Sequence, residues 1–188
     1  YPGDGRVVAV DAEDGSRAWS RDRYVEDHLV VADGTCFVGN YQGLHAIDCR
    51  NGTERWTFYR GDYRALRSPV VTPATIYAVE QPGEAGAASF ALDRTDGEPS
   101  PRWCSYIGDG AVTGATDELV LAVLELGEGP DAAHSVVAFT ADLGDAPWAI
   151  AGGSRPRDWV TRPALADDAV VVTTRGGTTV AFGARGDQ

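Results

Sequence analysis

Short runs of branched and aromatic residues alternate along the chain with clusters rich in Gly, Asp and Pro. Runs such as 7–10 and 44–47 are rich in the residue types that favour strands. The clusters between them, such as Asp33-Gly34, favour tight turns. No segment repeats its apolar residues with the period of 3.6 that marks a helix. The pattern therefore predicts an all-β chain with almost no helix.

One sequence frame, Ala-x-Asp-x-x-x-Gly-x-x-x-Trp, begins in several of these runs. Its copies are Ala9, Asp11, Gly15 and Trp19; Ala46, Asp48, Gly52 and Trp56; Ala91, Asp93, Gly97 and Trp103; and Ala138, Gly144 and Trp148. In the third copy an insert around Pro99 and Pro101 delays the Trp by two places, and in the fourth Thr140 replaces Asp. A fifth copy, 180–183, ends before any Trp. The frame is therefore a repeat.

Each frame has the chemistry of a β-hairpin. The Asp side chain can bond backbone amides ahead of it and open a turn. The Gly supplies a positive φ at the end of that turn, and the Trp begins the return strand, so we expect Trp103 to open the last strand of its hairpin. The Ala positions are 37, 45, 47 and 43 residues apart. Repeats of this length built from short strands are typical of β-propeller blades.

The frame resembles the tryptophan-docking motif of the PQQ-type (quinoprotein-like, BamB-like) β-propeller repeats. The resemblance covers nearly the whole chain and implies that each Trp docks onto the adjacent blade and ties blade to blade. A role in sugar or quinone stacking is disfavoured, because a binding site needs one Trp and not one in every blade. The family includes quinoprotein dehydrogenases and non-enzymatic scaffolds such as BamB, so the resemblance fixes a fold and leaves the function open.

The repeat predicts one all-β β-propeller domain or fragment, 1–188, of four-stranded antiparallel blades. About four blades are expected, the first and last of them partial, over residues 5–21, 25–59, 66–107, 111–152 and 160–184. Because the chain begins at Tyr1 and ends inside a blade, we interpret it as a fragment or a processed piece. The terminal strands could form one composite blade and close a ring of four. Alternatively the chain is half of an eight-bladed ring, which the usual size of PQQ-type rings favours and which predicts self-association.

The net charge of the chain limits the classes of molecule that it can bind. The net charge is −12, all 16 basic residues are Arg, and the pI is about 4.5. An acidic chain without Lys is typical of halophilic proteomes, which suggests a halophilic archaeon; a high-GC genome that favours Arg codons is the alternative. The charge argues against nucleic acid as a partner, since binding phosphates needs a basic patch. No membrane span is visible, and an extracytoplasmic or membrane-anchored location is favoured over others.

The candidate chemistry of the chain does not point to catalysis. Resemblance to quinoprotein dehydrogenases would imply a bound PQQ, a calcium ion, an Asp base and often two adjacent cysteines. The chain has no Cys-Cys pair and no Asn–Asp constellation that matches, so no catalytic, cofactor-binding or metal-binding residue is assigned and no cofactor is expected. The three cysteines, Cys36, Cys49 and Cys104, are expected to be buried free thiols. His45 is expected to be a packed or exposed strand residue.

Arg and Tyr gather in two connections between blades. The candidate interaction rim consists of Tyr59, Arg60, Tyr63, Arg64 and Arg67 in one connection and Arg155, Arg157 and Trp159 in the other. These residue types are enriched at protein interfaces. The simpler interpretation is a solvated loop whose Arg side chains pair with the acidic surface. The sequence thus predicts a non-catalytic scaffold for protein–protein interaction, with a fragment of a PQQ-dependent dehydrogenase as the alternative.

Overall fold

The computed structural model describes residues 5–23, 25, 29–59, 65–80, 88–106, 111–126, 133–141, 148–151, 164–166, 169–173 and 178–183. All regular structure in these ranges is β-strand, and no helix occurs in them. The chain divides into two compact units, residues 1–81 with 90–100 and residues 82–89 with 101–188. Each unit is described by itself.

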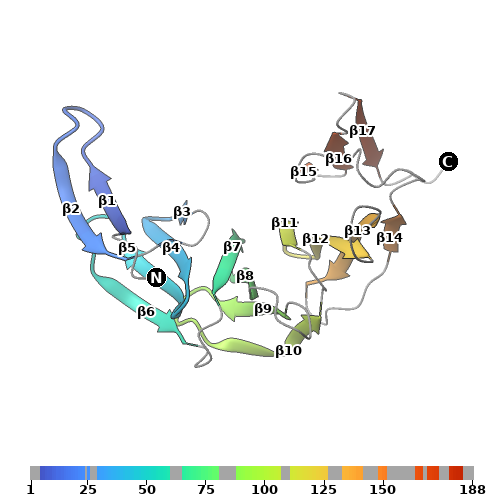
Figure 1. Ribbon diagram of the computed structural model, residues 1–188, viewed down its shortest axis with the longest axis horizontal. Helices are drawn as coiled ribbons and strands as arrows, with labels where there is room; N and C mark the ends of the chain where they lie inside the picture. The colour runs from blue at the N-terminus through green and yellow to red at the C-terminus, as the bar shows by residue number, and fades with distance from the viewer. Residues whose placement is uncertain are drawn as a thin grey trace. The chain divides into compact units, whose positions relative to one another are not determined.

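Unit 1 holds three sheets, of two, four and four strands in chain order (Figure 1). The last strand of the third sheet continues into unit 2. The first sheet pairs β1 (Arg6–Val10) with β2 (Arg17–Asp22). The second sheet runs in the order β3 (Leu29–Ala32), β4 (Thr35–Asn40), β5 (Gly43–Asp48) and β6 (Glu54–Phe58). The third sheet has the neighbours β7 (Leu66–Val71), β8 (Thr75–Glu80), β9 (Ala88–Asp93) and β10 (Pro99–Tyr106).

Unit 2 continues the same antiparallel plan. One sheet contains β11 (Ala111–Ala115), β12 (Leu119–Leu126), β13 (Ala133–Thr140) and β14 (Trp148–Ala151). The last sheet contains β15 (Ala164–Ala166), β16 (Ala169–Thr173) and β17 (Thr179–Gly183). The two sheets share a core in which Leu121, Val136 and Val170 are buried and Leu165 packs against them. A Cβ at Gly114 would lie 3.1 Å from Leu165 Cδ1, so the small residue lets the two sheets approach.

The sequence frame has the same register wherever the strand pairs are described. Ala9 lies opposite Trp19, Ala46 opposite Trp56 and Ala138 opposite Trp148. The turns between these strands also repeat. One backbone bond recurs in three turns, from Asp11 N to Ser16 O, from Asp48 N to Thr53 O and from Asp93 N to Glu98 O, each at 2.8 Å. The frame therefore marks the same hairpin in sheet after sheet, and the Asp caps it as its chemistry predicts.

Burial follows the position of a strand within its sheet more than an alternation along the strand. Every residue of β4 is buried, and so is β5 up to Asp48. The outer strand β6 is half-buried to exposed. Inner strands of stacked sheets are covered on both faces, and for that reason their sequence has no alternating pattern. Between the first and second sheets Val7, Cys36, Val38 and Ile47 form a buried cluster, against which Trp19 packs.

The fold confirms the all-β β-propeller prediction, with four-stranded antiparallel sheets and partial first and last sheets. One predicted boundary was wrong, because the strand expected to open at Trp103 begins at Pro99. Strand β10 is at the edge of its sheet, and an edge strand tolerates Pro because its outward amides need no partner in the ladder. The insert around Pro99 and Pro101 thus lengthens the strand. That all sheets form a single domain, 1–188, stays a prediction.

Candidate interaction surface

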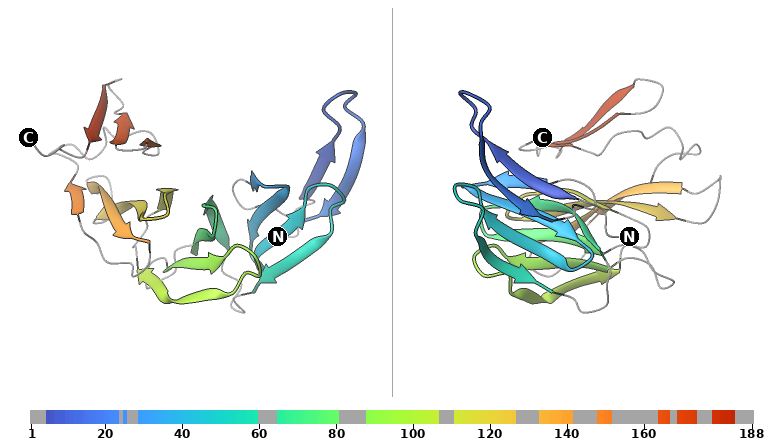
Figure 2. Two further views of the ribbon diagram at one scale, coloured as in Figure 1. Left: turned by 180° about the vertical axis from the view of Figure 1, so that it is seen from behind. Right: turned by 60° about the vertical axis from the view of Figure 1, so that its left-hand side comes forward.

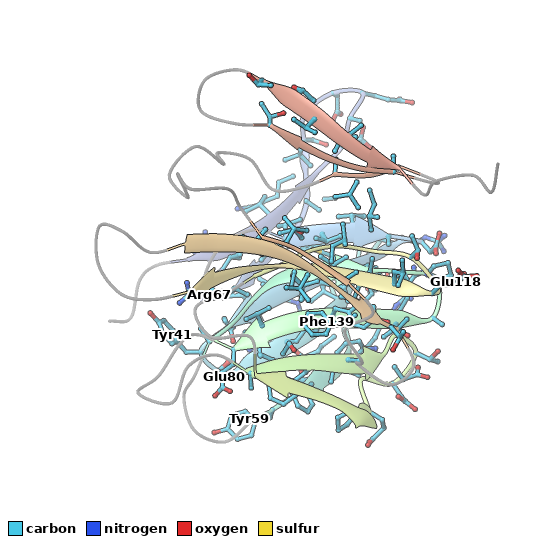
Figure 3. All side chains as sticks on the ribbon, turned by 90° about the vertical axis from the view of Figure 1, so that its right-hand side faces the viewer. Tyr41, Tyr59, Arg67, Glu80, Glu118 and Phe139 are labelled. Carbon is cyan, nitrogen blue, oxygen red and sulfur yellow. The ribbon has the colours of Figure 1, made fainter. Side chains whose placement is uncertain are left out.

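The antiparallel strand order places the β4–β5 turn and the connection from β6 to β7 at the same end of the sheets in unit 1. We call this end the rim end. Tyr41 in the β4–β5 turn is 41% exposed, and Tyr59 after β6 is 57% exposed. Arg67 in β7 is half-buried, and its Nε is buried with no hydrogen-bond partner among the described residues. Figure 3 shows Tyr41, Tyr59 and Arg67 on the same side of the unit.

Two glycines hold the backbones close together at the rim end. A Cβ at Gly39 would lie 2.0 Å from the Leu66 carbonyl oxygen, at the start of β7. A Cβ at Gly43 would lie 1.9 Å from the Phe58 carbonyl oxygen, and Gly43 has a φ of 136°. Neither contact leaves room for a side chain. The rim end is therefore a close-packed junction, and it fixes where Tyr59 leaves the sheet.

A network of polar side chains centred on the buried His45 lies next to the β4–β5 turn that carries Tyr41. His45 is only 2% exposed, and its Nε2 is 3.1 Å from Asn40 Oδ1. Its Nδ1 is 3.1 Å from Glu54 Oε2 and 3.0 Å from Thr57 Oγ1. Asn40 Oδ1 also accepts the Gln42 backbone N–H at 2.7 Å. These bonds connect β4, β5 and β6 and give the exposed turn a fixed base.

Arg23, which follows the first sheet, completes the network. It pairs with Glu54 through Nη2 and donates from Nη1 to Gln42 Oε1 at 2.9 Å. Burial lowers the pKa of His45 below its ordinary value of 6.5, and the charge of Arg23 lowers it further, against the opposing effect of Glu54. Burial acts to raise the pKa of Glu54, but the Thr57 hydrogen bond and the charges of Arg23 and His45 leave it lowered. At neutral pH the network therefore holds a neutral imidazole beside an Arg–carboxylate pair.

At the opposite end of unit 1, the motif Trp side chains contact the turn of the next sheet. Trp19 Nε1 donates to the Cys49 carbonyl at 2.7 Å, and a Cβ at Gly52 would lie 2.8 Å from the Trp19 ring. Trp56 repeats this arrangement one sheet further on. Its Nε1 donates to the Arg94 carbonyl at 3.1 Å, and a Cβ at Gly97 would lie 2.5 Å from its ring. Each ring thus lies against a frame Gly of the following sheet; that these contacts hold the sheets together stays a prediction.

The Arg94 side chain adds a second link between the same two sheets. Its Nη2 bonds Asp33 Oδ2 in the second sheet at 2.6 Å, and its Nη1 donates to the Thr72 and Pro73 carbonyls in the third, each at 3.3 Å. Its guanidinium lies 5.9 Å from the centre of the Phe37 ring. The side chain is 14% exposed. Arg94 therefore accepts a hydrogen bond from the Trp56 indole through its backbone carbonyl and bonds the second sheet through its side chain.

Several residues named from the sequence lie outside the described residues. These are Gly144 and, from the candidate rim, Arg60, Tyr63, Arg64, Arg155, Arg157 and Trp159. The backbones of Trp103 and Trp148 lie in β10 and β14. Asp11 and Gly15 lie in the β1–β2 turn, where Gly15 has a φ of 72°. The structure thus locates two of the eight rim residues, Tyr59 and Arg67, and their role stays a prediction.

Sequence reasoning missed the partners of His45 and Arg94. The alternation of 44–47 marked His45 as a strand residue, but Asn40, Glu54 and Arg23 come from other segments and no spacing joins them. His45 is confirmed as a packed residue. Cys36 is a buried free thiol as predicted, and Cys49 is free but only half-buried. The side chain of Cys104 lies outside the described set.

Within the described ranges, we find no group of three or more His, Cys, Asp or Glu side chains placed to hold a metal ion. In the same ranges, no helix has the length and apolar character needed to cross a bilayer.

Comparisons with solved structures give the same fold. BamB from Moraxella catarrhalis matches with a TM-score of 0.67 and 21% identity, over 98% of this chain and 54% of that chain. The computationally designed Ika4 protein matches with a TM-score of 0.60 and 12% identity, over 85% of this chain and 94% of that one. The N-terminal domain of Nup159 matches with a TM-score of 0.52 and 10% identity, over 85% and 41% of the two chains. This chain therefore spans about half the length of the BamB structure.

No curated protein matches the chain. A family model described as outer membrane protein assembly factor BamB matches residues 3–188, which is nearly the whole sequence. The repeated hairpins, the all-β sheets and this match agree. The chain belongs to the BamB family of PQQ-type β-propeller repeats.

Proposed function

We propose that this protein is a non-catalytic β-propeller scaffold that binds other proteins through the rim end. The supporting observation is a pair of exposed Tyr side chains, Tyr41 and Tyr59, on a close-packed base. Tyr gives a large contact area at small entropic cost, and a rigid base removes the cost of ordering a loop on binding. The half-buried Arg67 adds an arginine, a residue type enriched at protein interfaces, at the same end. The family description supports a role in protein assembly.

The proposal includes the setting in which the scaffold works. The charge of −12 and the absence of Lys support a halophilic archaeal origin. The match to a family described as an outer membrane protein assembly factor supports an extracytoplasmic or membrane-anchored location. Carboxylates repel one another at low ionic strength, and salt screens that repulsion. The free energy of unfolding should therefore rise steeply from dilute buffer to molar KCl. A stability that is independent of KCl, or that falls, would contradict the halophilic origin.

Capture of a partner tests the rim end. The immobilised protein is incubated with a high-salt lysate of the source cells, and the bound proteins are quantified by mass spectrometry. Tyr59→Ala and Arg67→Ala should each lower the amount of the same partner. Arg50→Ala is the matched control, since Arg50 is an exposed arginine in the β5–β6 turn, at the opposite end of the second sheet. Equal capture by all three variants would reject the rim end as the binding surface.

Incubation with PQQ and calcium tests the non-catalytic part of the proposal. We expect no stoichiometric quinone absorbance to remain with the protein after gel filtration. A bound and redox-active quinone would instead assign the chain to the dehydrogenase branch of the PQQ-type propellers. Finally, we propose that the chain self-associates, because Val8 and Val10 on β1 are exposed apolar side chains that a second copy could cover.

A further inference from the structure

The β5–β6 turn of the second sheet contains the sequence Asn51-Gly52-Thr53, which we call the turn sequon. Asn-x-Ser/Thr, in which x is not Pro, is the acceptor sequence of N-linked glycosylation. The chain has two Asn residues, and the other one, Asn40, is not followed two places later by Ser or Thr. A three-residue motif also occurs by chance, so the structure of the turn decides whether the motif can be used.

The two residues that define the turn sequon are both accessible. Asn51 and Thr53 are exposed, in the turn between β5 and β6. Figure 2 shows this turn at the same end of unit 1 as the turn between β1 and β2. Gly52, between the two exposed residues, is buried against the Trp19 ring, and its φ of 72° favours glycine. The turn is therefore fixed in shape while Asn51 and Thr53 stay open to solvent.

Hydrogen bonds fix the orientation of the Asn51 side-chain amide. Its Oδ1 accepts the backbone N–H of Thr53 at 2.9 Å and the Thr53 hydroxyl at 2.7 Å. Because a backbone N–H can only donate, the side-chain atom that faces it must be the amide oxygen. The other amide atom, Nδ2, is the one to which a glycan is joined, and it has no hydrogen bond to the residues that the structure describes. The reacting nitrogen is therefore accessible.

The fold of the turn does not require an amide at position 51. The first and third sheets have Asp14 and Asp96 at this place, and their Oδ1 atoms accept the backbone N–H two residues further on, at 2.8 and 3.0 Å. An Asp oxygen thus makes in two turns the bond that Asn51 makes in the second sheet. Thr53 is not required either, because the third turn has Glu98 in its place. In a chain with 28 acidic residues and two Asn, the turn sequon is therefore a departure that folding does not explain.

We propose that Asn51 is an N-glycosylation site, which receives an oligosaccharide from a lipid-linked phosphate donor through a separate glycosyltransferase. The proposal rests on the extracytoplasmic or membrane-anchored location proposed above, since this modification marks surface loops of secreted proteins. In the transfer, Asn51 Nδ2 attacks the anomeric carbon of the first sugar. The N–C bond forms as the C–O bond to the phosphate breaks, Nδ2 loses one proton, and the lipid phosphate is the leaving group.

A glycan on Asn51 would cover the end of the second sheet that the rim end leaves free. The turn sequon joins β5 to β6, whereas Tyr41 lies in the β4–β5 turn, at the opposite end of the same sheet. A bulky and hydrated oligosaccharide would keep other molecules away from the frame turns. The scaffold would then have one end for binding a partner and one end held in solvent.

Mass spectrometry of the protein from its source cells tests the site. Tagged protein is recovered from the cytoplasmic, membrane and extracellular fractions, and the peptide that contains Asn51 is sequenced from each. Outside the cytoplasm, we expect this peptide to carry on Asn51 an added mass equal to a sum of sugar residues. Asn51→Asp and Thr53→Glu should each abolish the addition without unfolding the protein, because they copy the residues of the other frame turns. Thr53→Ser is the matched control, since it keeps the acceptor sequence and should keep the glycan.

The fractions separate failure of the site from failure of the location. Protein found outside the cytoplasm with Asn51 unmodified, or converted only to Asp, would overturn the site and leave the location standing. Protein confined to the cytoplasm with Asn51 unmodified would reject the location and the site together. A glycan that persists in Asn51→Asp would lie on another residue and would also overturn the assignment.

Discussion

Replacing Gly52 by Ala tests whether the indole of Trp19 is held tightly against the next sheet. The new Cβ would lie 2.8 Å from Trp19 Cδ2, closer than real Cβ contacts come. The ring cannot retreat freely, because its Nε1 donates to the Cys49 carbonyl at 2.7 Å and the ring packs against the buried cluster of Val7 and Ile47. The substitution should therefore break or lengthen this hydrogen bond.

The magnitude follows from a comparison with Gly34→Ala. Gly52 has a φ of 72° and Gly34 a φ of 71°, so an Ala at either place carries a left-handed strain of about 1–2 kcal/mol. A less flexible unfolded chain offsets about 0.4–1 kcal/mol of that strain. Only at Gly52 is there added overpacking, about 1–3 kcal/mol, and a disturbed hydrogen bond, about 0.5–1.5 kcal/mol. We expect Gly52→Ala to lose about 2–4 kcal/mol of stability and Gly34→Ala about 1 kcal/mol.

Urea unfolding at one fixed high salt concentration measures both variants, with tryptophan fluorescence and far-ultraviolet circular dichroism as probes. Equal m-values would show that the variants differ in the folded state and not in the extent of unfolding. If the two midpoints gave free energies within about 0.5 kcal/mol of each other, the indole would not be confined at Gly52 and the docking role would be wrong.

Three further predictions concern polar and thiol groups. Because the folded-state pKa of His45 lies below 6.5, the unfolded chain binds the proton first, so stability should fall as the pH drops below 6.5; His45→Gln should flatten that part of a pH series of urea midpoints. Arg94→Lys should cost about 1–2 kcal/mol in the same assay, since one ammonium nitrogen cannot occupy both the place of Nη2, which bonds Asp33, and that of Nη1, which bonds two carbonyls; a stability equal to wild type would show that these bonds do not stabilise the fold. Burial raises the pKa of Cys36 to about 11, so iodoacetamide at pH 8 should label it slowly in the folded protein and rapidly in urea; fast labelling of the folded chain would place the thiol at the surface.

The sequence was sufficient for the fold because its signals are local and repeated. An Asp, a Gly with a positive φ and a following Trp describe a hairpin within one stretch of chain, and Ala46 opposite Trp56 shows that the frame reads the register correctly. The prediction that a strand begins at Trp103 was wrong because the start of this strand depends on its place in the sheet and not on the local sequence. Pro99 and Pro101 look like breakers in isolation, and only the position of β10 at the edge of its sheet makes them acceptable.

The candidate site was harder to predict, because its contacts join segments that are distant in sequence. Arg94 meets Asp33 across 61 residues, and Arg23 meets Glu54 across 31. No periodicity marks such pairs, and the charges involved look like ordinary surface groups. Tyr59 could be identified from the sequence because Arg and Tyr cluster near it. Tyr41 has no such cluster around it in the sequence, so no pattern singled it out. The sequence pattern does not show which connections lie at the same end of the sheets, so these contacts could not be predicted from it.

Two-dimensional NMR of the indole N–H groups tests the central claim most directly, namely that each motif Trp docks onto the frame Gly of the next sheet. Gly52→Ala should shift the Trp19 indole resonance and speed its hydrogen exchange while the Trp56 resonance stays in place. Gly97→Ala should do the reverse, because its Cβ would lie 2.5 Å from the Trp56 ring. If either variant left its own indole unchanged, or if both disturbed the two resonances alike, the sheets would not be joined in this way.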